Sequence, residues 1–116
     1  MAIIRALATA VSGRAILEFR NDWDREVTIV EALATLESEA GKMMPLLAAQ
    51  LTIRLGEPKG VDVTEPLRKM LGSHRTSTFL IRLVLDPEPP TQPQPAIYSV
   101  ELANGGVGYF GRPRRC

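Results

Sequence analysis

His74 is the first residue to consider for chemistry, because it is the one histidine of this 116-residue chain and imidazole titrates near neutral pH. Ser73 and Ser77 lie close to it in sequence, but neither has the flanking glycines of a nucleophile elbow. A single histidine also excludes a multi-histidine metal site within one chain. We therefore expect no catalytic residue and no metal site, with His74 on a surface turn. The alternative is that His74 is a general acid or base.

Basic residues surround the end of a helix expected near residue 71. They are Arg68, Lys69, His74, Arg75 and Arg82. Such a cluster could bind an anion, including the phosphates of a nucleic acid. The simpler interpretation is that these cations balance the negative end of the helix dipole. Aromatic residues make up 5% of the chain and none interleaves with the cluster, so nucleic-acid binding through it and the basic tail at 112–116 is the weaker hypothesis.

Two pairs of carboxylates could share a metal ion, Asp22 with Asp24 and Glu37 with Glu39. Residues two apart on a helix point to different sides, so we expect each pair to be solvated instead. The loop at 56–60 has the glycines and lysine of a phosphate loop but not its six-residue frame or its Gly-Lys-Ser/Thr ending. No cofactor is expected.

Two strands are the clearest elements of the chain. Residues 76–85 alternate so that Phe79, Ile81, Leu83 and Leu85 share one face, with Thr78, Leu80, Arg82 and Val84 on the other. Residues 96–103 alternate in the same way. Both segments therefore predict strands that pack an apolar face on a core.

The second of these strands runs into Asn104-Gly105, the preferred pair for a two-residue type I′ hairpin turn. That turn would place Leu102 opposite Val107 and Val100 opposite Tyr109. The returning strand, up to Gly111, would be an edge strand. We expect it to be an interface with another chain, through Val107, Tyr109 and Phe110.

Earlier in the chain, helical spacing of apolar residues predicts a short helix over residues 3–11, which Gly13 ends. Residues 14–20 alternate and predict a strand. A second helix is expected from a cap at 21–22 to Gly41. Its start, Val27 to Val30, is rich in β-branched residues, so a strand is the alternative there.

Residues 42–45 are expected to interrupt the regular secondary structure. A further strand is expected over residues 50–55. Asp62 and Glu65 have the spacing of a capping box. They predict a helix of one or two turns with Leu67, Met70 and Leu71 as its apolar stripe, which Gly72 ends.

The expected fold class is α+β, a single domain over residues 1–116. We expect a mixed sheet of about five strands that ends in an antiparallel hairpin, with two or three helices mainly on one face and right-handed crossovers. A proline-rich connection at 86–95 should be extended. Its Pro90-x-x-Pro93 spacing is that of a groove-binding peptide, although such segments are more often stiff connectors.

Composition is that of an ordinary globular protein, with 45% hydrophobic and 23% charged residues and a net charge of +1. Cys116 is the one cysteine, which excludes an internal disulfide. No apolar run reaches the length of a membrane span. We expect an intracellular (cytoplasmic) protein. The first seventeen residues contain no acidic residue, which is typical of a transit peptide. Organelle targeting is therefore kept as the weaker alternative.

Few catalytic candidates and an apolar hairpin favour a non-enzymatic protein–protein interaction or assembly protein that forms homo-oligomers. The mixture of arginine, proline and leucine resembles the composition of small viral or phage accessory proteins. One alternative is a small enzyme with a pocket around His74 and Arg75, completed at a subunit interface. The other alternative is a nucleic-acid-binding regulator.

Overall fold

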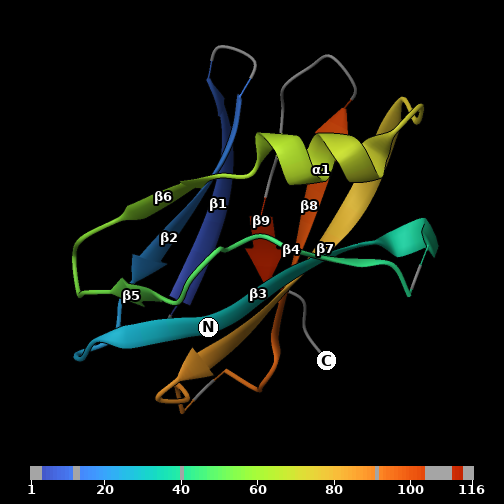
Figure 1. Cartoon of the computed structure of the whole chain (residues 1–116). Coiled ribbons are helices and arrows are strands. Elements are labelled where there is room, and N and C mark those ends of the chain that lie inside the picture. Colours follow the sequence, from blue (N-terminus) through green and yellow to red (C-terminus); the bar gives the residue numbers. More distant parts are fainter. Residues whose placement is uncertain (1–3, 12–13, 40, 91, 104–110, 114–116) are drawn as a thin grey trace.

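Antiparallel strands organise the chain (Figure 1). The computed structural model describes residues 4–11, 14–39, 41–90, 92–103 and 111–113. Within these ranges the strands are β1 (Ile4–Val11), β2 (Arg14–Asn21), β3 (Val27–Leu36), β4 (Met43–Pro45), β5 (Leu51–Ile53), β6 (Lys59–Asp62), β7 (Thr76–Asp86), β8 (Ala96–Ala103) and β9 (Gly111–Pro113). The helices of the described residues are α1 (Thr64–Leu71) and the single 3-10 turn η1 (Glu37–Glu39).

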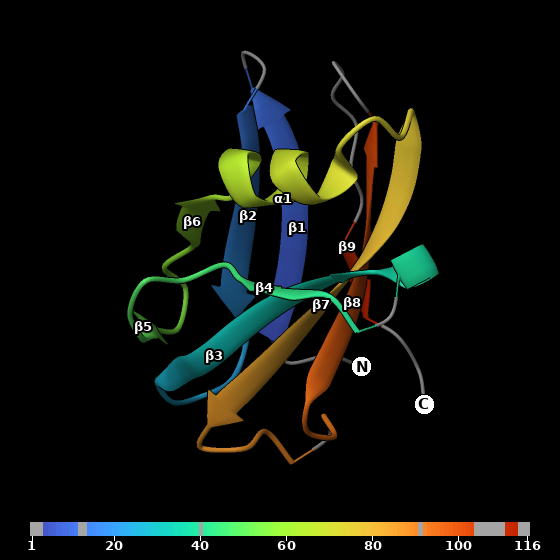
Figure 2. The same cartoon turned by 45° about the vertical axis from the view of Figure 1, so that its right-hand side comes forward.

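These strands form two sheets. The smaller sheet has the order β1-β2-β6, and the larger has the order β4-β3-β7-β8-β9, with β5 also paired to β3. Every ladder among the described residues is antiparallel, and a parallel bridge between Asn21 and Leu55 links the end of β2 to the segment after β5. Figure 2 shows the two sheets as separate layers with α1 at one end.

One apolar core lies between the sheets. Alternate residues of each long strand point into it, among them Leu17 and Phe19 from β2, and Phe79, Ile81 and Leu83 from β7. The helix α1 packs against β2 of one sheet and β3 of the other. Its buried Leu67 and Leu71 join the same core, so α1 closes one end of the space between the layers.

The expected α+β class with a mixed sheet and two or three helices on one face is wrong. The described residues are mostly strand, with one α-helix, and the pairing contains none of the expected parallel crossovers. The segments at 3–11 and 22–40, expected to be helices, contain β1 and β3 instead. Each of these strands carries a pattern that imitates helical spacing.

In β3 the imitation comes from a bulge. Ile29 pairs with Leu85 and Glu31 with Val84, so one extra residue lies in β3 at Val30. Val30 and Glu31 are both exposed, and the inward residues continue at Ala32. The inward spacing is therefore three across the bulge, which is also a helical spacing. The strand alternative for residues 27–30 is confirmed.

In β1 the imitation comes from the apolar residues at 4, 7, 8 and 11, which recur at helical spacing, and alanine adds to it. The sequence IRALATAV is rich in a residue with the highest helix propensity. It nevertheless pairs with β2 along its whole length, from Ile4 opposite Asn21 to Val11 opposite Arg14. Ile4 and Ala6 are buried and Arg5 and Leu7 are exposed, which is the two-residue period of a strand.

Other predictions are confirmed. The expected strands at 14–20, 50–55, 76–85 and 96–103 correspond to β2, β5, β7 and β8. The two short strands β4 and β6 lie where a break and a loop were expected.

The helix α1 is also confirmed, and Gly72 ends it with a positive φ of 57°. The cap position is Val63 rather than Asp62. Asp62 instead accepts a hydrogen bond from the Thr64 N–H at 2.9 Å. Bonds from the Thr64 side chain and backbone, together with Arg14, hold the pKa of Asp62 below its ordinary value.

The predicted register of the last hairpin is wrong. Val100 pairs with Gly111, not with Tyr109, so the connection is two residues longer than a two-residue turn at Asn104-Gly105 allows. The turn itself, with Val107, Tyr109 and Phe110, lies outside the described residues. In the part of the chain that the structure describes, no helix has the length and apolar character of a membrane span.

Candidate functional site: the outer face of the larger sheet

The larger sheet has a second face, which points away from the core. On β7 this face carries Thr78, Leu80, Arg82 and Val84, as the alternation predicts. The ladders place Leu33 of β3 and Ile97 of β8 directly beside Arg82. Residues opposite each other in neighbouring strands have their side chains in contact range.

Arg82 is therefore the centre of a ring of four aliphatic side chains. We call Leu33, Leu80, Val84 and Ile97, with Arg82, the outer patch. Arg82 is exposed, and the four aliphatic side chains are only partly covered. No carboxylate of the described residues forms an ion pair with Arg82. Arginine is one of the residue types that most often carry the binding energy at the centre of a protein interface.

Two acids share this face with the outer patch. Glu31 pairs with Val84, and Glu101 pairs with Thr78. Both are exposed, and neither has an ion pair among the residues that the structure describes. Since they lie at opposite ends of the patch from each other, the face carries a central positive charge with negative charges at its borders.

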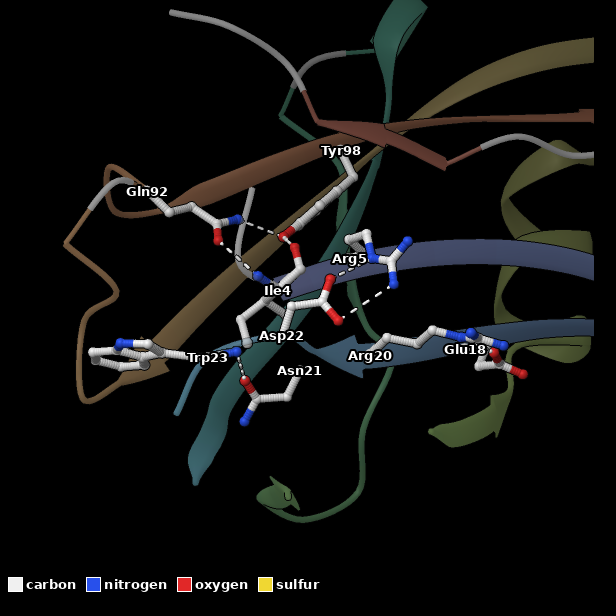
Figure 3. Close-up of polar contacts among 9 residues, drawn as sticks. All are labelled: Ile4, Arg5, Glu18, Arg20, Asn21, Asp22, Trp23, Gln92 and Tyr98. Atoms are coloured by element: carbon white, nitrogen blue, oxygen red, sulfur yellow. Dashed lines mark hydrogen bonds and ion pairs between the residues drawn. The ribbon is translucent and has the colours of Figure 1, made fainter. Parts of the chain in front are cut away.

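The first two strands of the smaller sheet contrast with this arrangement, because each described charge on β1 and β2 has an ion-pair partner. Arg5 Nε lies 2.7 Å from a carboxylate oxygen of Asp22, and Arg20 Nε lies 2.8 Å from Glu18 (Figure 3). Such exposed pairs contribute little to stability. They leave no described charge of β1 and β2 without an ion-pair partner.

The sequence-predicted anion cluster is not gathered into one cavity. Arg68 and Lys69 lie in the last turn of α1, whereas His74 and Arg75 lie in the turn before β7. Lys69 lines a cavity next to Met70, and His74 lines a different one. Arg82 lies on the outer face, in the middle of β7.

The cavity at His74 has a volume of about 480 Å³ and is lined by Glu37, Ser38, His74, Thr76, Ser77 and Thr78. His74 Nε2 lies 3.9 Å from Glu39 Oε1, and the imidazole is about half exposed. Three or more potential metal ligands do not come together anywhere in the described ranges.

A buried polar joint on the inner side ties the smaller sheet to the larger one (Figure 3). The Tyr98 hydroxyl donates to the Ile4 carbonyl at 2.6 Å and accepts from the Gln92 amide, whose oxygen accepts from the Ile4 N–H at 3.3 Å. Burial raises the pKa of Tyr98 to about 12, although the Gln92 bond opposes this shift.

Gln92 therefore holds part of the proline-rich connection against the core. It is buried, while Pro90 and Pro93 on either side are exposed. Gln94 further accepts a bond from the Leu85 N–H at 3.0 Å. The segment is thus fixed by glutamine side chains, and its use as a partner ligand stays a prediction.

Asn21 forms a second joint, where β2 meets β5. Its side-chain amide donates to the carbonyls of Arg25 at 2.7 Å and Ile53 at 2.9 Å, and its oxygen accepts from the Trp23 N–H at 2.8 Å. The side chain is buried with three hydrogen bonds. Neither joint was predicted, since nothing in the sequence marks Asn21 or Gln92 as buried.

Comparison with protein-family models, with curated proteins and with solved structures finds no match for this chain.

Proposed function

We propose that this protein is a non-enzymatic assembly protein that pairs with a second copy of itself through the outer face of the larger sheet. The observation that carries the proposal is Arg82, an exposed cation ringed by four aliphatic side chains and without an ion pair among the described residues. Covering the ring would remove apolar surface from water, which is the main driving force of association.

A second copy is the favoured occupant because this face is complementary to itself. Isologous pairing brings residue i of one copy to residue j of the other and j to i. A twofold axis across the strands near Leu80 would place Arg82 of each copy opposite Thr78 of the other, beside Glu101. The dimer would then contain two Arg82–Glu101 pairs, one on each side of the two facing Leu80 side chains.

Light scattering across a dilution series tests this proposal. We expect the wild-type chain to dimerise, Arg82→Glu and Glu101→Arg each to give monomer, and the double charge exchange to restore the dimer. Arg75→Glu is the matched control, since Arg75 is also exposed but lies in the turn before β7. A wild-type monomer at every concentration, or a dimer indifferent to both single exchanges, would contradict the proposal.

The cavity at His74 supports a second candidate, a small enzyme with a serine nucleophile. Glu39 lies within ion-pair distance of His74, and Ser38 and Ser77 line the same cavity. A carboxylate that orients a histidine beside a hydroxyl is the arrangement that activates serine.

A serine-reactive phosphonate probe tests this candidate. Labelling at Ser38 or Ser77 that is lost in His74→Gln and kept in Ser73→Ala would support the enzyme, because Ser73 does not line the cavity. If His74→Gln is labelled as well as the wild type, the enzyme proposal fails.

A further inference from the structure

A second concave site lies between α1 and β4, at the edge of the larger sheet. It has a volume of about 210 Å³ and an apolar wall of Leu36, Met43, Met44 and Met70. Three of the chain's four methionines thus line one cavity. Methionine side chains are flexible and polarizable, and they adapt to apolar ligands of different shape.

The volume limits the ligand to a small apolar group. A cavity of about 150 Å³ accepts benzene, so this one has room for an aliphatic group of about six to eight carbons. Met43 is 55% exposed, which leaves one side of the site open to solvent. A ligand can therefore keep a polar end in water while its chain contacts the methionines.

The charges at the rim select the sign of that polar end. Lys42, Lys69 and Glu39 line the cavity. The Glu39 carboxylate is already engaged, 3.3 Å from Lys42 Nζ and 3.9 Å from His74 Nε2. Lys69 has no ion pair with any carboxylate that the structure describes. The rim therefore favours an anion and opposes a cation.

We propose that this cavity binds an aliphatic carboxylate, with the chain against Met43, Met44 and Met70 and the carboxylate at Lys69. The same chemistry occurs in a free medium-chain fatty acid and in an apolar C-terminal residue of a peptide. This site is distinct from the outer patch and does not depend on self-association.

Titration of the full chain with octanoate tests the site, followed by NMR of its labelled methionine methyl groups. We expect saturable shifts of the Met43, Met44 and Met70 methyls, with octylamine binding much more weakly because it carries the opposite charge. A short peptide ending in leucine, compared with its C-terminal amide, distinguishes a protein terminus from a free fatty acid.

Two pairs of variants make the test specific. Lys69→Glu should weaken octanoate binding about tenfold, whereas Lys59→Glu, an exposed lysine on β6, should not. Met43→Gln should weaken binding, and Leu55→Gln should not, although these two side chains are similarly exposed at 55% and 57%.

Two outcomes would overturn the proposal. One is equal shifts from octanoate and octylamine, which would mean that charge has no part in binding. The other is no methyl shift from either octanoate or the peptide up to about 10 mM, a concentration that corresponds to negligible affinity. Both outcomes can occur whether or not the chain dimerises, so they are separable from failure of the assembly proposal.

Discussion

The two faces of β7 have similar apolar residues but different surroundings. Phe79, Ile81 and Leu83 point inward and have no exposed surface. Leu80 and Val84, on the other face of the same strand, are only partly covered. The inner residues hold the two sheets together. No layer of the described residues covers the outer residues, so they are free to contact the partner that we propose.

Polar groups on the two sides differ in the same way. On the inner side Tyr98, Gln92 and Asn21 are buried, and each has hydrogen bonds to the backbone or to one another. On the outer side Arg82 has no ion pair with a described residue. A polar group that is satisfied within the monomer supports folding, whereas one that lacks a partner can support recognition.

The largest expected effect is on the inner face. Ile81→Ala should lower the free energy of unfolding by about 2–5 kcal/mol, because it leaves a cavity at a residue with no exposed surface. Val84→Ala, on the outer face of the same strand, should cost at most about 1 kcal/mol. Chemical denaturation of both variants measures the difference. Equal losses would mean that the outer face is also part of the core.

The second-largest loss of stability is expected at the polar joint of Tyr98, Gln92 and Ile4, which connects the two sheets. Tyr98→Phe removes the hydroxyl that donates to the Ile4 carbonyl and accepts from Gln92. We expect a loss of about 1–3 kcal/mol in the free energy of unfolding, because buried polar groups are left unpaired. Ser99→Ala, at the next position but on the outer face, is the control. A loss in Tyr98→Phe no larger than in Ser99→Ala would show that the joint does not stabilise the monomer.

High pH should weaken the same joint. The pKa of Tyr98 is raised from 10.0 to about 12, so the folded state resists ionisation of this phenol more than the unfolded state does. Its contribution to stability is complete below pH 10 and is lost as the pH rises through 12. Denaturation at pH 9 and pH 11 should show this loss in the wild type and not in Tyr98→Phe. An identical pH dependence of the two proteins would contradict the assignment.

The smallest effect on stability is expected at the centre of the outer patch. Arg82→Gln should change the free energy of unfolding of the monomer by less than about 0.5 kcal/mol, because the residue is exposed. The same change should weaken dimerisation about tenfold by removing the charge from the interface. A large loss of monomer stability would place Arg82 in the fold rather than in an interface.

The sequence was most informative where one strict pattern operates. The alternation in β7 identifies the strand and assigns Phe79 and Arg82 to their correct faces. Gly72, with its positive φ, correctly marks the end of α1. In each case the pattern is local, so neighbours far along the chain do not change its meaning.

Elsewhere tertiary pairing decides the structure. The bulge at Val30 makes β3 resemble a helix, and its ladders with β4, β5 and β7 identify it as a strand. The three residues of β4 are too few for any periodicity. Long-range pairing of this kind overrides local propensity.

The outer patch was half visible in the sequence. Alternation placed Leu80, Arg82 and Val84 on one face, but Leu33 lay in a segment expected to be a helix. That Leu33 and Ile97 flank Arg82 follows only from the strand order β3-β7-β8. The patch can therefore be recognised only once the strand order is known, and the strand order was not predicted from the sequence.

The bond between Tyr98 and Ile4 has a consequence for how the chain is made. Its two residues are 94 positions apart. A ribosome adds about 5–20 residues per second, so Ile4 waits roughly 5–20 s for Tyr98 to be synthesised. During that time β1 can pair with β2 as a hairpin, and β3 can pair with β7, but the bond that joins β1 to β8 cannot form. The Ile4 carbonyl therefore stays without its Tyr98 partner until β8 has been synthesised.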